Sequence, residues 1–166
     1  MIPQPCSFFY RHLAKSELTR EPDWNQSGKM ISLTEIKVRG YHTDIYGHVN
    51  NARYLEFFEE ERWAQFDANV DLRKWAEKGL VFMVVNINVN YRKAVSFGER
   101  LLVSTGVEKI GNRSAVLKQE IRVKDSGELA ADALVTFVLS DKTGQLLSMD
   151  DDLAEGILKI GRSQPQ

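Results

Sequence analysis

The chain has 166 residues, 43% of them hydrophobic, and its 22 lysines and arginines nearly balance its 23 aspartates and glutamates. This length suits one domain with a single core, and the balanced charge excludes a global field that would attract nucleic acid or an anionic membrane. The only cysteine, Cys6, excludes an intramolecular disulfide and fits a reducing cytoplasm, and no apolar stretch approaches the roughly 20 residues needed to span a bilayer.

Residues 1–30 differ in pattern from the rest of the chain. Three of the four prolines (Pro3, Pro5 and Pro22) lie here, and this part shows neither sustained alternation nor a helical stripe. It also lacks the basic start and apolar run of a secretory leader. We interpret residues 1–30 as a poorly ordered N-terminal extension, with an ordinary, partly ordered arm as the alternative. We expect the folded domain to span residues 31–160.

A strand followed by one long helix is predicted next. Residues 33–40 alternate in the manner of a half-buried strand. The period changes after Asn51, and residues 52–66 contain neither Gly nor Pro, which predicts a helix. Its wide apolar arc, with Glu56 and Glu60 opposite, implies burial on more than one side. The arc consists of Tyr54, Leu55, Phe57, Phe58, Ala64 and Phe66.

The rest of the chain predicts a short surface helix and then strands. The helix covers residues 71–78 and is closed by Gly79 as its C-terminal cap. Short turns between consecutive strands predict an antiparallel sheet, which must curl around the long helix to cover it. We therefore predict an α+β fold, with a five-stranded antiparallel sheet wrapped around one central helix. The later strands are expected at residues 81–92, 100–110, 114–124 and 129–140.

The polar segment before the long helix carries the candidate chemistry. It concentrates two of the three histidines with an aspartate, a glycine and two asparagines. Asn50 or Asn51 would cap the helix, leaving backbone N–H groups to stabilise a carbonyl oxygen that gains negative charge. Taken singly, such an aspartate is more often a turn residue, and a lone histidine is more often simply hydrogen-bonded. Finding these residues together in one short segment favours a functional site over single structural roles. The core of the segment reads Asp44-Ile45-Tyr46-Gly47-His48-Val49-Asn50-Asn51.

This segment resembles the signature of the 4-hydroxybenzoyl-CoA thioesterase family of hotdog-fold enzymes, in which Asp-x-x-Gly-His-Val-Asn-Asn leads into the central helix. The resemblance covers about residues 31–150 and looks like the bacterial long-chain acyl-CoA thioesterase III branch. It implies hydrolysis of a medium- to long-chain fatty acyl-CoA, without cofactor or metal, by a homodimer or homotetramer. Matching stretches outside the signature are residues 39–42, 51–57, 84–92 and 131–137.

The resemblance also assigns roles to residues. The catalytic aspartate of the family falls on Asp44, as general base toward water or as nucleophile, and both routes stay open. His48 is the second catalytic candidate, although orienting the loop or contacting the thioester is an equally open role. Some hotdog thioesterases use a carboxylate on the helix instead, which makes Glu61 the rival; its plainer interpretation is a helix-end residue that reaches solvent. The substrate-binding candidates are Tyr41, Asn50, Asn51, Tyr54, Phe58, Arg92 and Lys93.

Two further interpretations remain open at this point. Arg92 and Lys93 would bind coenzyme A phosphates, or would form an ordinary basic pair on the surface. A non-catalytic acyl-CoA-binding or sensing module is the alternative function, against which the complete motif around Asp44 argues. A dehydratase or hydratase on the same fold would need other motifs, which we do not find. The acidic run 59–61 has no metal-ligand spacing, so no metal site is predicted.

Overall fold

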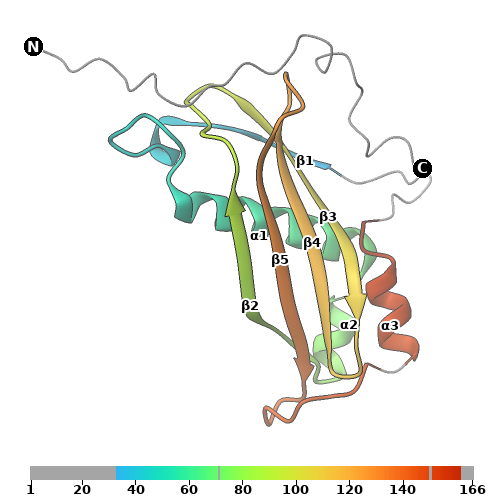
Figure 1. Cartoon of the computed structure of the whole chain (residues 1–166). Coiled ribbons are helices and arrows are strands. Elements are labelled where there is room, and N and C mark those ends of the chain that lie inside the picture. The colour runs from blue at the N-terminus through green and yellow to red at the C-terminus, as the bar shows by residue number, and fades with distance from the viewer. Residues whose placement is uncertain (1–32, 71, 150, 162–166) are drawn as a thin grey trace, which may run out of the picture.

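A computed structural model of the protein describes residues 33–70, 72–149 and 151–161, so the predicted extension, residues 1–30, lies outside the described part. The described residues form strands, two α-helices between the first and second strands, and a third α-helix after the last strand (Figure 1). In chain order these are β1 (Leu33–Lys37), the 3₁₀ helix η3 (Gly40–His42), α1 (Asn51–Asn69), α2 (Leu72–Glu77), β2 (Val81–Tyr91), β3 (Arg100–Ile110), β4 (Ser114–Val123), β5 (Leu129–Ser140) and α3 (Asp151–Leu158).

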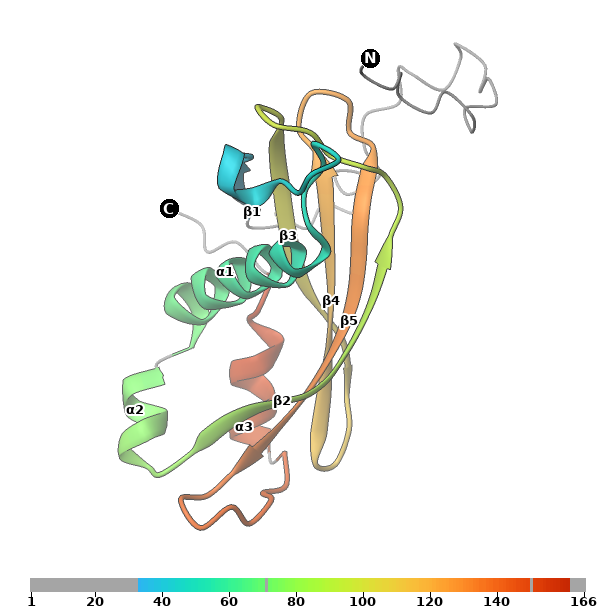
Figure 2. The same ribbon diagram turned by 90° about the vertical axis from the view of Figure 1, so that its left-hand side faces the viewer.

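The five strands form one antiparallel sheet in the order β1-β3-β4-β5-β2, which confirms the predicted α+β class. Hairpins join β3 to β4 and β4 to β5, whereas β2 pairs with β5 and forms one edge of the sheet. Helix α1 lies across one face of the sheet and packs on β1, β3 and β4 (Figure 2). Its first residue, Asn51, is hydrogen-bonded to Tyr91 of the edge strand β2, where the loop after η3 enters the helix.

Helix α1 buries a face that is only partly the predicted apolar arc. Tyr54, Phe57, Phe58 and Phe66 are buried as expected, and Glu56 and Glu60 are exposed. Leu55 is 37% exposed, however, so its place in the buried arc was wrong. Three polar side chains also lie on the buried side of α1, where they form hydrogen bonds. These buried polar residues are Glu61, Arg62 and Gln65.

A buried polar network joins α1 to the middle of the sheet. Arg62 Nη1 donates to Gln119 Oε1 at 2.9 Å. The Gln119 amide nitrogen in turn donates to the carbonyl oxygen of Phe58 at 2.9 Å and to Thr105 Oγ1 at 2.7 Å. Burial lowers the pKa of Arg62, since desolvation disfavours its charged form. This network fixes how α1 sits on β3 and β4, because buried polar groups need their partners.

The shorter helix agrees with its prediction. Helix α2 ends just before Gly79, whose φ of 81° lies in the left-handed region that a C-terminal cap uses. The N–H of Leu80 donates back to the carbonyl of Trp75 at 2.9 Å, which closes the turn. The predicted start at residue 71 lies outside the described residues. Within the described part of the chain, no helix combines the length and apolar character needed to cross a membrane.

Helix α3 was not predicted. Its eight residues begin with acidic residues and have an amphipathic pattern, both of which favour a helix, whereas Gly156 lowers helix propensity. Tertiary contacts also hold it, since Ile157 and Ile160 are buried. The N–H of Gly161 donates to Gln65 Oε1 at 2.9 Å, and a Cβ at this glycine would lie 2.4 Å from the carbonyl oxygen of Thr105. The chain after α3 is thus part of the packed domain.

Candidate functional site

The motif loop, residues 43–50, forms a tight reversal between η3 and α1. Thr43 and Val49 form an antiparallel bridge, and the N–H of Asp44 donates to the carbonyl of His48 at 2.9 Å. The N–H of Gly47 donates to the carbonyl of Asp44 at 3.0 Å, with φ of Gly47 at 76°. A side chain at that position would be strained, so the glycine of the motif is required by the backbone. The loop therefore presents Asp44 from a defined turn.

Two neighbouring segments hold the motif loop in place. On one side, the N–H of Val49 donates to the carbonyl of Val95 at 2.8 Å, and His48 forms a bridge with Ser96. On the other side, the carbonyl of His42 accepts from the N–H of Asn50 at 2.9 Å. The loop is thus bonded both to the connection between β2 and β3 and to η3.

His42 is a supporting residue to which sequence reasoning gave no role. It is buried, its Nδ1 accepts from the N–H of Arg39 at 3.0 Å, and its ring lies edge-on to Phe57 at 4.9 Å between centroids. Burial is the main cause that lowers the pKa of His42, and the nearby Arg53 adds to it, so this histidine favours the neutral form. In the sequence, only its position just before the motif pointed to His42. That position does not distinguish a histidine that supports the fold from one that takes part in catalysis.

Asp44 is half-buried and only partly engaged in hydrogen bonds. Its Oδ1 accepts from the N–H of Tyr46 at 2.9 Å, which is the bond of an Asx turn. Among the described residues its Oδ2 has no hydrogen-bond partner, and the His48 side chain, which is exposed, has none either. One carboxylate oxygen therefore orients the side chain while the other is free to meet a reactant.

The start of α1 offers a free backbone donor beside this loop. Asn50 is the N-cap of α1. Its Oδ1 accepts from the N–H of Ala52 at 3.0 Å, and its backbone carbonyl accepts from the N–H of Arg53 at 2.9 Å. The N–H of Asn51 has no acceptor among the described residues, and Asn51 is exposed. Because this N–H lies at the positive end of the helix dipole, it suits an oxygen that gains negative charge.

The predicted substrate-binding residues separate into two groups. Tyr41 is 72% exposed beside the motif loop, together with Asn50 and Asn51. Tyr54 is 3% exposed and Phe58 is fully buried in the core. Burial, followed by Glu99 and Tyr91, raises the pKa of Tyr54 to about 12. The structure thus places the first group at the surface by the motif loop and the second in the core.

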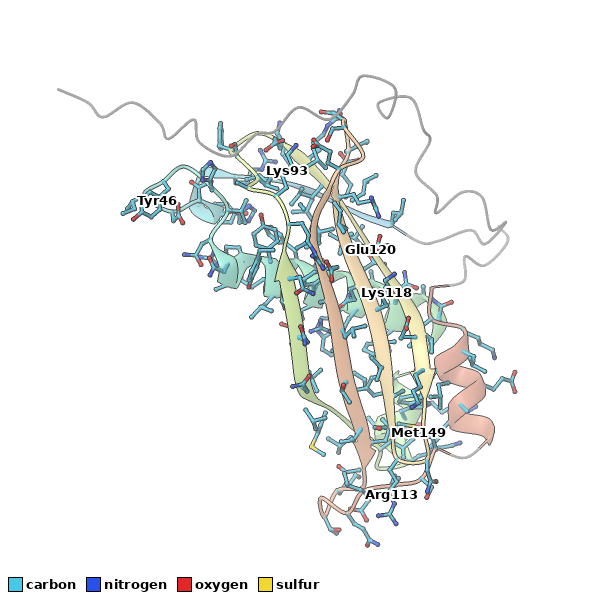
Figure 3. All side chains as sticks on the ribbon, in the orientation of Figure 1. Tyr46, Lys93, Arg113, Lys118, Glu120 and Met149 are labelled. Atoms are coloured by element: carbon cyan, nitrogen blue, oxygen red, sulfur yellow. The ribbon has the colours of Figure 1, made fainter. Side chains whose placement is uncertain are left out.

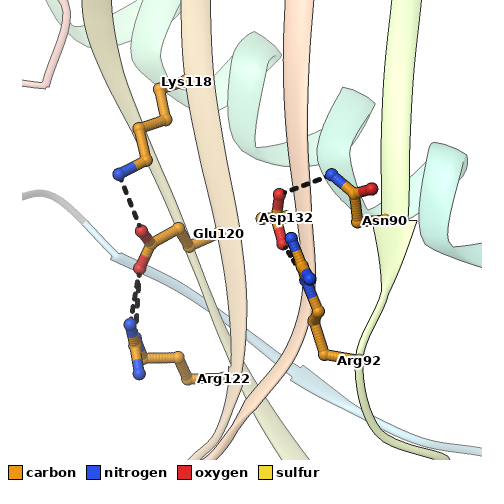
Figure 4. Close-up of polar contacts among 6 residues, drawn as sticks. All are labelled: Asn90, Arg92, Lys118, Glu120, Arg122 and Asp132. Carbon is orange, nitrogen blue, oxygen red and sulfur yellow. Dashed lines mark hydrogen bonds and ion pairs between the residues drawn. The ribbon is translucent and has the colours of Figure 1, made fainter.

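Arg92 and Lys93 already have carboxylate partners. Arg92 Nε lies 2.6 Å from Asp132 Oδ1, as Figure 4 shows, and Lys93 is paired with Glu128. These pairs lower the pKa of both carboxyl groups. Figure 3 shows Lys93 and Tyr46 of the motif loop at the same end of the molecule, far from Arg113. Among the described residues, no three His, Cys, Asp or Glu side chains gather to hold a metal ion.

Glu61, the rival carboxylate, is fully buried. It accepts hydrogen bonds from Thr34 Oγ1 of β1 and from Gln65 Nε2, the latter at 2.8 Å. Its interpretation as a helix-end residue that reaches solvent was therefore wrong. Burial raises the pKa of Glu61, although its two hydrogen bonds oppose the shift.

Glu61→Gln should remove a pH dependence of stability. The raised pKa means that the folded state favours the protonated acid, so the contribution of Glu61 is complete below its ordinary pKa of 4.5 and is lost as pH rises through the folded pKa. The neutral amide keeps the shape without this loss. We expect the variant to melt near the temperature of the parent at pH 4.5 and above it at pH 8, with the difference growing as pH rises. Calorimetry across this range measures it; a constant difference would contradict the assignment.

Comparison with known proteins places the chain in one family. Residues 38–157 match the thioesterase-like superfamily. The chain is 44% identical, over 74% of its length and 93% of the relative's, to the long-chain acyl-CoA thioesterase FadM of Escherichia coli (strain K12). The crystal structure of the probable thioesterase YbaW of Escherichia coli superposes with a TM-score of 0.74, at 40% identity and with 78% of this chain and 98% of that chain covered.

A second solved relative is a thioesterase from Thermus thermophilus, crystallised with coenzyme A and Zn. It superposes with a TM-score of 0.66 at 26% identity, covering 78% of this chain and 93% of that chain. These likenesses confirm the predicted hotdog fold, whose sheet and helix are those described above. The chain therefore belongs to the thioesterase-like superfamily.

Proposed function

We propose that the protein is an acyl-CoA thioesterase that cleaves medium- to long-chain fatty acyl-CoA into free fatty acid and CoA, as a cytoplasmic enzyme of fatty acid metabolism. One observation carries the proposal: in the described part of the chain, Asp44 has one carboxylate oxygen without a partner and Asn51 has a helix-start N–H without an acceptor, and both belong to the motif loop and the helix start that follows it. Its identity of 44% to a long-chain acyl-CoA thioesterase supports the substrate class.

The chemistry follows from these two groups. The Asn51 N–H would donate to the thioester carbonyl oxygen and stabilise its negative charge as the carbonyl carbon is attacked. In the general-base route, Asp44 takes a proton from water, the hydroxide adds to the carbon, and the CoA thiolate leaves and is protonated. In the nucleophile route, Asp44 itself adds, expels the thiolate and leaves a mixed anhydride that water hydrolyses. His48, whose carbonyl accepts from the N–H of Asp44 in the same loop, has an exposed side chain that would contact the thioester or the leaving sulfur.

The structure favours Asp44 over Glu61 for this role. Asp44 is half-buried with one unengaged oxygen, whereas Glu61 has no exposed surface and both its oxygens accept hydrogen bonds. A carboxylate that must reach a substrate needs access to it. Glu61 is therefore assigned to the core.

Coenzyme A would bind beside the motif loop. The exposed Tyr41 and Asn50 would border the thioester, and the buried Tyr54 and Phe58 would contribute apolar surface to the acyl site. Arg92 and Lys93 would meet the phosphates by exchanging their present carboxylate partners, Asp132 and Glu128, for phosphate oxygens; these exposed pairs are weak and cost little to open.

The proposed enzyme is a homodimer, or a homotetramer of two such dimers. Strand β2 is an edge that carries exposed apolar side chains, among them Val84, Val85 and Ile87, and such edges pair with another strand. We expect Val85→Lys to shift the protein toward monomer and to lower its activity, whereas Leu134→Lys, an equally drastic change at an exposed position of the inner strand β5, leaves it at least dimeric. Sedimentation at micromolar concentration measures this, and a fully active monomeric parent would refute it.

The alternative, a non-catalytic acyl-CoA-binding module, is tested by assaying thiol release. Acyl-CoAs of increasing chain length are offered to the protein, and both free thiol and binding are measured. Turnover that rises toward medium and long chains supports the proposed function. Tight binding without release at every chain length would support the module instead.

A further inference from the structure

Tyr91 makes a contact with the candidate site that the motif does not include. Its hydroxyl donates to the carbonyl oxygen of Asn51 at 3.2 Å. Tyr91 is the last residue of the edge strand β2, and Asn51 is the first residue of α1. The ring of Tyr91 also lies edge-on to Tyr54 of α1, with 5.3 Å between ring centroids. Two contacts therefore join the end of β2 to the first turn of the helix.

The residue that Tyr91 holds is the one with the free backbone donor. The N–H of Asn51 has no acceptor among the described residues, and the first residue of a helix is the least constrained by intrahelical bonds. Asn50 accepts from the N–H groups of Ala52 and Arg53, and not from the N–H of Asn51. The N–H of Asn51 shares a peptide plane with the carbonyl of Asn50, which accepts from the N–H of Arg53, whereas the carbonyl of Asn51 lies in the next plane and accepts from Tyr91. The two hydrogen bonds hold the planes on either side of the Asn51 Cα, so the bond from Tyr91 helps to fix where Asn51 and its N–H lie.

We propose that Tyr91 is a positioning residue that holds Asn51 so that its N–H is directed at the thioester carbonyl oxygen. The inference rests on the proposed function of this site. Catalysis through backbone donors depends on placement, because a misplacement of about 1 Å can cost roughly 10² in rate. Tyr91 acts through Asn51 and takes no part in bond making. Because Tyr91 belongs to the edge strand β2, its hydrogen bond also links that strand to the helix start that carries the proposed backbone donor.

The test is Tyr91→Phe, which removes the hydroxyl and keeps the ring against Tyr54. We expect kcat for a long-chain acyl-CoA to fall about tenfold, less than the roughly 10²–10³ typical when an oxyanion donor is itself lost. The KM should stay within about twofold and the melting temperature within about 2 °C. The amide resonance of Asn51 in the ligand-free protein should shift, since its backbone loses a hydrogen bond.

Asn90→Ala is the matched control. It removes another side-chain hydrogen bond of β2, from Asn90 Nδ2 to Asp132 at 2.9 Å, next to Tyr91 but on the opposite face of the strand. This variant should keep the parental kcat and the parental Asn51 resonance. If it slows the enzyme as much as Tyr91→Phe does, the effect belongs to the strand and the proposal fails.

Other outcomes would also overturn the proposal. An unchanged kcat in Tyr91→Phe would show that the hydroxyl positions nothing, and a rise in KM at constant kcat would make Tyr91 an ordinary substrate contact. If the variant melts far lower and loses activity in proportion, its role is only structural. If the parent releases no thiol at all, the proposed function fails instead, and the Asn51 resonance still decides whether the hydroxyl holds the helix start.

Discussion

The Asp44→Asn variant is expected to lose about 10²–10⁴ in kcat on a long-chain acyl-CoA while it still binds CoA. Asparagine keeps the size of the side chain and the oxygen that accepts from the N–H of Tyr46, so the turn of the motif loop should persist. It removes the negative charge that both routes need, whether as base or as nucleophile. Steady-state kinetics with a titration of CoA binding measures both properties.

Glu61→Gln is the matched control for this loss. It makes the same chemical change at the other candidate carboxylate, which is fully buried and bonded to Thr34 and Gln65. Its kcat should stay within a few-fold of the parent. If Glu61→Gln abolishes turnover while Asp44→Asn remains near the parent, the catalytic carboxylate belongs to the helix and the assignment of Asp44 is wrong.

Gln119→Leu is expected to cost about 2–4 kcal/mol in the free energy of unfolding. The side chain of Gln119 accepts from Arg62 and donates to Thr105, so leucine of similar volume leaves a buried cation and a buried hydroxyl without this partner. Such an orphaned charge costs more than the hydrogen bond itself contributes. Urea unfolding at one fixed protein concentration measures the loss, because the stability of an oligomer depends on concentration.

The double variant Arg62→Met/Gln119→Leu separates the two causes. It removes the buried charge together with its acceptor, and well-packed apolar pairs of similar volume are often as stable as the polar ones they replace. We expect it to recover most of the stability lost in Gln119→Leu. A double variant less stable than the single one would mean that Arg62 stabilises the core through contacts other than Gln119.

The strands could be predicted from the sequence because their signals are local. Alternation in residues 33–40 predicts the first strand, although β1 ends at Lys37 and Gly40 begins η3. Turn residues such as Gly98 mark strand ends without any knowledge of partners. The same holds for the motif loop, where Gly47 and the N-cap Asn50 take the conformations that their residue types favour. The roles of Asp44 and His48 came from a resemblance, and they stay predictions until variants are measured.

What could not be predicted depends on contacts between distant parts of the chain. Arg62 and Gln119 are 57 residues apart, and Tyr91 lies 40 residues from Asn51. Apolar periodicity cannot show that Arg62 lies on the inner side of α1, because only the sheet supplies its partner. Helix α3 differs, because its amphipathic pattern is a local signal and its buried Ile157 lies on the apolar side. Long-range polar pairing is thus the part of this fold that the sequence pattern does not reveal.

The most direct measurement is the amount of free CoA thiol that the full chain releases from an excess of long-chain acyl-CoA. We predict many equivalents of thiol per chain, with one free fatty acid formed for each thiol, and a rate that falls in Asp44→Asn. Saturable binding of the acyl-CoA that ends without thiol release, in the parent as in the variant, would contradict the proposed function.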